Sequence, residues 1–307
     1  MQGKADTHVH TMFSGFGRYR RIKYPESMTP PEEAVDAAIA RKLDVLCVTD
    51  HNSIAGAARA RKYALDGKKA IEVVVGEEVS TCDGEVVGLC LNEAIPAHIS
   101  AAEAVERIRS QGGLAVAVHP YSFYCPSLGE KVKELPLDGM EVLNAAHFDG
   151  FVNRLALQHI PKGVAPLGGS DAHSTRMVGN AYTTFEGNTA DDFFKAVRSC
   201  RTAPAGRTTT IWETINWTTD MAKGILGRML TRDRRPIPGD PRKDPLEQTD
   251  RVRPHNRAII TFGAILYLLT PLPFIVGAMG SENIRRKGRE AWKRHALKEN
   301  SDIRRRP

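Results

Sequence analysis

Five short segments of the sequence carry histidine and carboxylate side chains at spacings that suit metal binding. They read Asp6-Thr-His8-Val-His10, Thr49-Asp50-His51, Gly76-Glu77-Glu78, His119-Pro120 and Ser170-Asp171-Ala172-His173. Imidazole and carboxylate ligands together favour Zn, Mn or Fe over a site built from thiolates. One pair of histidines at i and i+2 is weak support by itself, because both simply face the same side of a strand.

Four of these segments come directly after a short apolar run that is typical of a buried strand. The predicted strands are Leu43–Val48, Ile71–Val75, Leu114–Val118 and Val164–Leu167, with two more at Glu85–Leu91 and Met140–Leu143. Helical patterns begin after Thr29, Ser100 and Thr189, so strands and helices alternate as in an α/β fold with a parallel sheet or barrel. The carboxyl ends of barrel strands meet at one mouth, which would gather the candidate ligands there.

Some of these residues also have ordinary structural explanations. Side chains alternate along a strand, so only one of Glu77 and Glu78 can face the site, and the other would be a solvated carboxylate. Asp171 could instead form an Asx turn after Gly168 and Gly169, glycines that are expected to permit a close turn rather than to bind phosphate. Five histidines lie in no motif and are interpreted as structural or exposed: His98, His147, His159, His255 and His295.

The motifs DxHxH, TDH, GxE, HP and SDAH, in this order and at these intervals, resemble those of the PHP (polymerase and histidinol phosphatase) superfamily. The resemblance extends from residue 4 to about residue 205. It implies a distorted (β/α)7 barrel with two or three divalent metal ions at its mouth. It also implies a hydrolase of phosphate esters, such as histidinol phosphate, nucleotides, short oligonucleotides or DNA 3′ ends.

The resemblance, carried over motif by motif, implies ligands for two metals. His8, His10 and Asp171 would hold the first metal. Glu78 would bridge the first and second metals, and the family pattern selects it over its neighbour in the GxE motif. His119 would hold the second metal. Mn, Zn and Fe all suit such ligands.

The remaining candidates concern a third metal and the residues around the ligands. His51 and His173 would serve the third metal. Asp6 is expected to orient a histidine ring from behind, a role that metal-bound histidines usually require. Asp50 could be a ligand or such a partner, and Asp50 and His173 are the candidate catalytic residues.

Two positions depart from the family pattern. Many relatives have a histidine in the strand after GxE, where this chain has Glu85, and oxygen ligation there would favour Mn or Mg. Relatives also often place a His or Asp shortly after HxH, where this chain reads Ser14-Gly-Phe-Gly17. We therefore expect a third metal to bind weakly or not at all.

The expected reaction is hydrolysis by a water that the metals activate. Two ions roughly 3.5–4 Å apart can lower the pKa of a bridging water toward 7 and clamp the phosphate, so no protein nucleophile is needed. Arg18 and Arg176 are candidate substrate-binding residues, although a solvated loop is the favoured interpretation for Arg18. The substrate is expected to be a phosphorylated small molecule or a short oligonucleotide. The alternative is a non-hydrolytic metal-binding module tethered to a membrane complex.

Charge divides the chain into two parts. Residues 1–206 carry 22 Lys+Arg against 25 Asp+Glu, a net charge of −3, and residues 207–307 carry 21 against 11, a net charge of +10. The first part does not look like a nucleic-acid-binding surface, and no stable nucleic-acid complex is predicted. The start of the chain, MQGKADTHVH, lacks the apolar core of a signal peptide. Five cysteines without a CxxC pair favour a reducing compartment, with Cys47 and Cys90 packed in apolar runs.

We divide the chain into a phosphoesterase domain (1–206), an amphipathic helix and polar linker (207–257), a hydrophobic membrane segment (258–281) and a basic tail (282–307). The 24 residues 258–281 include no charged residue and could cross a bilayer at ~1.5 Å rise per residue. Basic residues flank both ends, and Pro271 and Pro273 interrupt the middle, so a spanning helix, a re-entrant hairpin and a buried core helix stay open. We expect this segment to contact membrane lipid and to anchor the protein at the cytoplasmic face.

Overall fold

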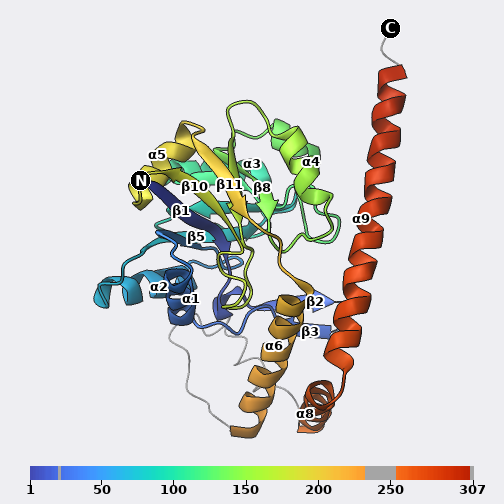
Figure 1. The fold of residues 1–307 in the computed structure, drawn as a ribbon. Helices are drawn as coiled ribbons and strands as arrows, with labels where there is room; N and C mark the ends of the chain where they lie inside the picture. Colours follow the sequence, from blue (N-terminus) through green and yellow to red (C-terminus); the bar gives the residue numbers. More distant parts are fainter. Residues whose placement is uncertain (20–21, 232–253, 305–307) are drawn as a thin grey trace.

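The computed structural model describes residues 1–19, 22–231 and 254–304. Its centre is a nine-stranded sheet with the order β11-β10-β1-β4-β5-β6-β7-β8-β9, seen in Figure 1. The strands are β1 (Gln2–Val9), β4 (Val45–Val48), β5 (Glu72–Ser80), β6 (Glu85–Leu89), β7 (Leu114–Ala117), β8 (Gly139–Asn144), β9 (Ala165–Gly169), β10 (Ala181–Glu186) and β11 (Thr202–Gly206). All six strands expected from the apolar runs are present, and a separate hairpin pairs β2 (Phe16–Tyr19) with β3 (Ile22–Pro25).

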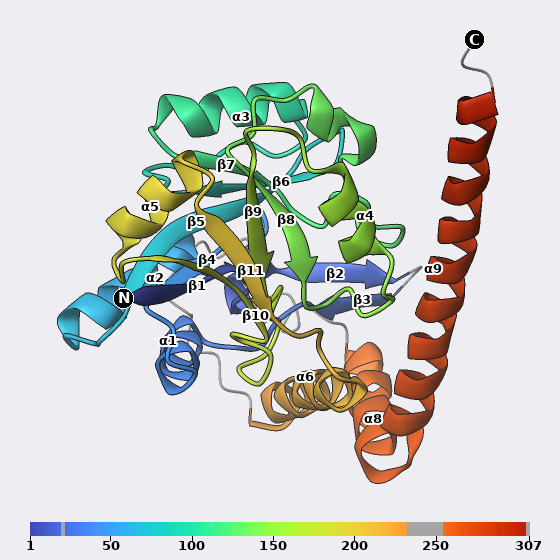
Figure 2. The same cartoon turned by 45° about the horizontal axis from the view of Figure 1, so that its top comes forward.

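The sheet curls until β9 meets β1 and β11, which gives a nearly closed barrel (Figure 2). Side chains make the closing contacts: Thr7 Oγ1 donates to the carbonyl of Gly168 at 3.1 Å, and Thr202 Oγ1 donates to the carbonyl of Pro166 at 2.8 Å. Beyond β9, a single parallel bridge joins Val9 to Ala172. The expected α/β barrel is therefore confirmed as a class, with a closure that depends on side chains rather than on a full strand ladder.

The regular strand-then-helix repeat is broken on one side of the barrel. Strand β6 runs antiparallel to both β5 and β7, whereas the pairs β1–β4, β4–β5, β7–β8 and β8–β9 are parallel. The cause is the short connection between Ser80 and Glu85, because a parallel crossover needs a dozen or more residues. Strand β5 also continues past the expected end at Val75, through Glu78, to Ser80.

Five helices surround the barrel: α1 (Pro31–Ala40), α2 (Ala55–Asp66), α3 (Ala101–Ser110), α4 (Val152–His159) and α5 (Ala190–Arg198). Ser100 caps α3 and Thr189 caps α5 through their side-chain oxygens, as Ser and Thr commonly do. Phe193 of α5 is fully buried among the residues that begin the strands, including Ala5 and Leu114. Helix α5 therefore closes the end of the barrel opposite the mouth.

The cysteines agree only in part with the sequence interpretation. All five are free thiols. Cys47 is buried inside β4, as expected, and burial raises the pKa of its thiol well above the usual value. Cys90 is exposed instead, because β6 ends at Leu89 and the chain turns there with a φ of 62° at Cys90.

Among the described residues, three helices follow the barrel: α6 (Ile211–Thr231), α8 (Pro254–Leu269) and α9 (Leu272–Arg304). The expected amphipathic helix corresponds to α6, while most of the expected linker, residues 232–253, lies outside the described residues. Tyr267 of α8 donates to Thr218 Oγ1 of α6 at 2.8 Å. Helix α9 runs along one side of the barrel (Figure 1), where Trp292 packs 5.7 Å from Phe151 between ring centroids.

The segment 258–281 is divided between α8 and α9, which bend by 84° at the break before Leu272. Among the described helices, none is by itself long and apolar enough to cross a bilayer, but this bent pair meets the criterion of length and composition together. The break lies at Pro271, as the two prolines predicted.

Barrel closure yields a stability prediction at Gly168. A Cβ there would lie 2.6 Å from the backbone oxygen of Tyr182, and backbone cannot move aside as a flexible side chain can. Gly168→Ala should lower the free energy of unfolding by about 1–3 kcal/mol, the usual cost of overpacking. Urea denaturation followed by circular dichroism measures this. Gly227→Ala, where a Cβ meets nothing within 4 Å, is the matched control, and equal stability of the two variants would contradict the closure described here.

Candidate metal centre

The barrel mouth collects all seven candidate ligands. His8 lies in β1 and His10 follows it, while Glu78 lies in β5. The remaining four come directly or shortly after their strands: His51 after β4, His119 after β7, and Asp171 and His173 after β9. These residues form overlapping groups whose ligand atoms lie within 4.8 Å of one another.

The ligand atoms of His8, His10 and Glu78 lie at the mutual distances expected around one ion, and Asp171 lies beside both histidines. His8 Nε2 is 3.0 Å from His10 Nε2, and both nitrogens are 3.2 Å from Glu78 Oε2. Asp171 Oδ1 lies 3.3 Å from His10 Nε2 and 3.7 Å from His8 Nε2. Ligands about 2.1 Å from a tetrahedral ion would lie about 3.4 Å apart. This group therefore fits the first metal inferred from the motifs.

A second group shares Glu78. Its other oxygen, Oε1, is 3.1 Å from His119 Nε2. His51 Nδ1 is 3.2 Å from Glu78 Oε2 and 3.7 Å from Glu85 Oε1. Glu85, the residue that departs from the family pattern, thus places an oxygen beside the other candidate ligands. A carboxylate with both oxygens among imidazoles is suited to bridge two ions.

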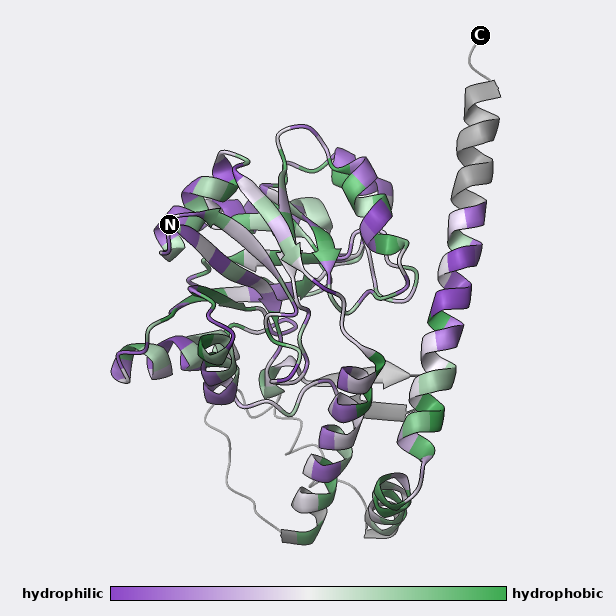
Figure 3. Ribbon diagram, viewed as in Figure 1, coloured by the Kyte–Doolittle hydropathy of each residue, from purple (hydrophilic) through white to green (hydrophobic). Residues whose placement is uncertain are grey.

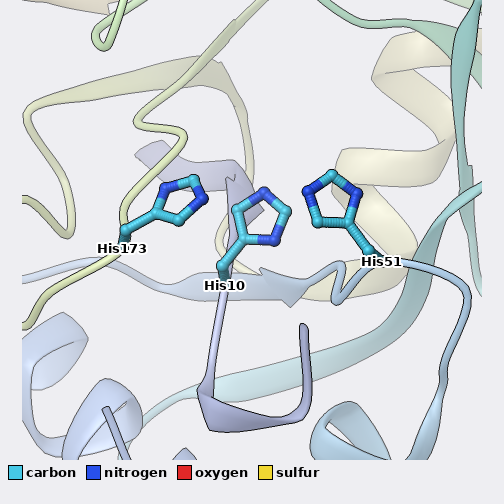
Figure 4. Close-up of side chains that lie close together, drawn as sticks. All are labelled: His10, His51 and His173. Atoms are coloured by element: carbon cyan, nitrogen blue, oxygen red, sulfur yellow. The ribbon is translucent and has the colours of Figure 1, made fainter. Parts of the chain in front are cut away.

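A third group consists of His10, His51 and His173, whose imidazole rings face one another in Figure 4. The ring centroids of His10 and His173 are 4.3 Å apart, and those of His10 and His51 are 4.8 Å apart. Glu26 joins this group, since its Oε2 lies 3.0 Å from His51 Nε2. Glu26, in the loop after β3, therefore adds a carboxylate to the third group. The sequence had shown no His or Asp for this role shortly after the HxH motif.

Behind His10, a polar chain fixes the ring. His10 Nδ1 lies 2.8 Å from Ser14 Oγ, which donates to Asp50 Oδ1 at 2.8 Å. The backbone N–H of Thr11 also donates to Asp50 Oδ1, at 2.6 Å. Asp50 belongs to none of the ligand groups formed by the described residues. Its position suits a partner that orients His10 and leaves Nε2 to face the centre.

The expected role of Asp6 is wrong. Its carboxylate accepts the backbone N–H groups of Ser170 at 2.9 Å and Gly179 at 2.8 Å, so it holds the loop after β9 and orients no ring. Glu141 orients His8 instead, with Oε1 3.2 Å from His8 Nδ1. A carboxylate does orient a histidine ring, as expected, but Glu141 of β8 supplies it rather than Asp6 of β1.

Glu141 connects three parts of the centre. Besides contacting His8, it accepts the backbone N–H of His119 at 2.9 Å and the Asn144 side-chain amide at 2.8 Å, both on Oε2. Asn144 Nδ2 also donates to Asp171 Oδ2 at 3.1 Å. Both carboxylate oxygens of Glu141 therefore accept from donors that belong to, or position, candidate ligands.

Sequence reasoning missed Glu141 and Glu26. Glu141 had a signal, because it is a charged residue inside the apolar run of β8. Glu26 had none beyond being an acidic loop residue. The expectation for Glu77 was partly wrong: it points away from Glu78, but it is fully buried, and its Oε2 accepts the backbone N–H of Ile95 at 2.7 Å.

The two substrate-binding candidates stay predictions. Arg18 lies in β2, and its side chain is outside the described part of the structure. Arg176 is exposed on the loop that follows His173, and its backbone carbonyl accepts from Arg41.

The pKa directions show that this centre demands positive charge. Burial alone would lower the pKa of His8, but Asp171 and Glu78 raise it well above its ordinary value. Burial would raise the pKa of Glu78, but His51 and His8 hold it well below its usual range. The raised pKa of His8 favours its protonated form, and divalent cations can take the place of such protons when they bind.

Two other groups of the centre have shifted pKa values: the pKa of His173 is lowered and that of Glu85 is raised. Burial and the nearby His10 lower the pKa of His173 to about 4, so its imidazole is neutral near pH 7 and can offer a lone pair. Burial and Glu78 raise the pKa of Glu85 to about 7. Imidazole and carboxylate groups converge at this centre. Together they form a donor set that fits divalent metal ions.

The bridging role of Glu141 yields a metal-binding prediction. In Glu141→Gln, an NH₂ group replaces one carboxylate oxygen and must face a hydrogen-bond donor. One of the contacts to His8 or His119 is therefore lost. Metal affinity should fall about 10–100-fold, the usual effect of such outer partners, as measured by competition with a chromophoric chelator. The matched control is Glu77→Gln, a buried glutamate that faces away from the centre. Unchanged affinity in Glu141→Gln would contradict the bracing role.

Comparisons with known proteins agree with this geometry. A family model described as the PHP domain matches residues 6–163, and a second, described as PHP-associated, matches residues 153–202. The uncharacterized protein MJ1587 of Methanocaldococcus jannaschii is 45% identical over 159 residues, which cover 52% of this chain and 92% of that protein. The uncharacterized protein MJ0417 of the same organism is 30% identical over 190 residues, 59% of this chain and 70% of that protein.

Two crystal structures share the fold at low sequence identity. One is a two-domain protein from Bacteroides vulgatus, described as containing a predicted PHP-like metal-dependent phosphoesterase, with 18% identity, a TM-score of 0.53 and coverage of 67% of this chain. This chain covers only 65% of that protein's length. The other is PsfC from Pseudomonas syringae, with 17% identity, a TM-score of 0.52, and coverage of 72% of this chain and 98% of that one. With the PHP model matched over residues 6–163 and the motif residues gathered at one mouth, the chain belongs to the PHP domain family.

Proposed function

We propose that this protein is a metal-dependent hydrolase of phosphate esters. The observation that carries the proposal is the position of Glu78, whose two oxygens lie 3.1–3.2 Å from nitrogens of four histidines. A shared carboxylate between two groups of ligands is what a two-metal phosphoesterase needs. The family match supports the same reaction class.

Bound divalent ions would lower the pKa of a water, so that it loses a proton and can attack phosphorus. They would also neutralise charge on the phosphate. The residues of this chain prepare that site. Ser14 and Asp50 hold His10, and Glu141 holds His8, so both rings present Nε2 to the centre. His173 keeps a neutral imidazole at the edge of the centre, where its lone pair can bind an ion.

Hydrolysis is tested with Asp171→Asn. The substitution removes the carboxylate that lies beside His8 and His10, so turnover of p-nitrophenyl phosphate with added Mn or Zn should fall by more than about 100-fold, beyond the effect of outer partners. Asp66→Asn, on the exposed end of α2, is the matched control. Full activity in Asp171→Asn would reject the ligand assignment.

A phosphate-release screen separates the proposed hydrolase from the non-hydrolytic alternative. The screen covers nucleotides, dinucleotides and sugar phosphates, with Mn, Zn and Fe each supplied. Tightly bound metal measured by elemental analysis, without turnover of any ester, would favour the non-hydrolytic metal-binding module. The screen also distinguishes small phosphorylated molecules from short oligonucleotides as substrates.

We also propose that α8 and the start of α9 contact a membrane surface. Large apolar side chains are exposed on both helices, with Phe262 at 68% and Met279 at 70% exposure, and Figure 3 shows the hydrophobic stretch giving way to a hydrophilic one along α9. Exposed patches of this kind mark interaction surfaces. Arg285, Arg286 and Lys287 follow directly, and basic residues next to an apolar segment favour anionic lipid.

Membrane contact is tested by flotation. The purified protein should float with vesicles of phosphatidylcholine and phosphatidylglycerol, and less with phosphatidylcholine alone. The double variant Phe262→Asp, Met279→Asp should lose at least about 10-fold in bound fraction, since charged groups enter lipid at high cost. Leu157→Asp, at an exposed apolar position on α4 (58%), should float normally. A wild-type protein that stays with the soluble fraction would overturn this proposal and the expected anchoring at the cytoplasmic face.

A further inference from the structure

A cavity of about 240 Å³ lies beside the metal centre, between the barrel mouth and α6. Its walls include Met28, Thr29, His173, Trp217, Met221 and Gly224. Helix α6 begins at Ile211, beyond residue 202, where the family match ends. The cavity is therefore built partly from a segment that the family models do not describe.

His173 belongs both to this cavity and to the centre. Its ring lies 5.3 Å from the indole of Trp217, between centroids, and 4.3 Å from the ring of His10. Trp217 Nε1 donates to the backbone carbonyl of Glu26 at 2.9 Å, and Glu26 contacts His51. A molecule in the cavity would thus touch one candidate ligand directly and lie next to the others.

Helix α6 is held firmly enough to act as a wall. Arg207 binds Glu213 through both carboxylate oxygens, at 2.8 and 2.9 Å, and the backbone N–H of Thr210 donates to Glu213 Oε2 at 2.8 Å. Farther along α6, a Cβ on Gly224 would lie 2.6 Å from Met28 Cε. The absence of a side chain at Gly224 lets Met28 approach α6 and complete the apolar lining.

The lining indicates what the cavity accepts. Two thioethers and an indole give apolar surface, and Thr29, Ser174 and Thr175 add uncharged hydroxyl groups. No Lys or Arg is among the described residues that line the cavity. Two carboxylates, Glu33 and Asp220, also border the cavity, and Lys223 on the same helix is 3.9 Å from Asp220 in an exposed pair. A second phosphate or carboxylate on the substrate would be repelled here, because nothing in the lining balances its charge.

The volume sets the size of the group. Pockets for whole ligands usually span about 300–1,000 Å³, so this cavity suits one ring system while the phosphate lies at the centre. We propose that it binds the uncharged, apolar part of the alcohol in a phosphate monoester, and that Trp217 and Met221 of α6 determine this specificity. The inference rests on the proposed hydrolase function, because it assigns a substrate class to the same site.

The test compares two substrates and one analogue that cannot be hydrolysed. Met221→Arg places a cation in the apolar lining. It should reduce kcat/KM for 1-naphthyl phosphate about 10-fold, in the range of a lost apolar contact, and change kcat/KM for glycerol 1-phosphate by less than about 2-fold. Binding of 1-naphthylmethylphosphonate, measured by isothermal titration calorimetry, should weaken by a similar factor. Lys223→Ala, on the exposed surface of the same helix, should leave both substrates and the phosphonate unaffected.

The outcomes separate this proposal from the proposed function. Tight phosphonate binding that Met221→Arg weakens, without turnover of either ester, would keep the cavity assignment and reject hydrolysis. An unchanged ratio of the two kcat/KM values in Met221→Arg, with unchanged phosphonate affinity, would overturn the cavity assignment and keep hydrolysis. If Met221→Arg impairs both substrates equally, Met221→Ala decides: a selective loss for the naphthyl ester supports the proposal, and an equal loss rejects it.

Discussion

Glu78 imposes the main constraint on this structure, because its buried carboxylate is shared by His8, His10, His51 and His119. A buried charge is costly unless it is paired and hydrogen-bonded. Three further groups, on Glu85, Asp171 and His173, belong to the same ligand clusters, so the charges must balance as a set. The barrel can keep this arrangement only if cations, whether protons or metal ions, lie among the ligands.

Several features of the fold follow from that constraint. Strand β5 runs on through Glu78, and its hairpin with β6 returns Glu85 to the same mouth. An all-parallel barrel would have placed the start of β6 at the opposite end. Gly169 has no side chain, which leaves room for Glu141 beside His8. Closure of the barrel between β1 and β9 then brings Asp171 to the two histidines of the first motif.

The sequence allowed much of this arrangement to be predicted. Apolar runs followed at once by His51, His119 or Asp171 located both the strands and the mouth, because parallel strands deliver their carboxyl ends to one edge. The antiparallel direction of β6 was not predicted. The expected strand ended at Val75, and only its extension to Ser80 leaves a connection of four residues before Glu85, too short for a parallel crossover. Glu26 and Glu141 could not be assigned, because their roles depend on distances between segments far apart in the chain. Helix α6 was expected as an amphipathic helix, but no pattern in the sequence showed that Trp217 would face His173.

The most direct measurement is the anomalous scattering of crystals grown with Mn or Zn, with data collected on both sides of the metal absorption edge. The account predicts at least two peaks that share Glu78, one contacted by His8, His10 and Asp171 and the other by His119. Metal-loaded crystals without a peak at Glu78, or with peaks only at surface sites away from the barrel mouth, would contradict the account.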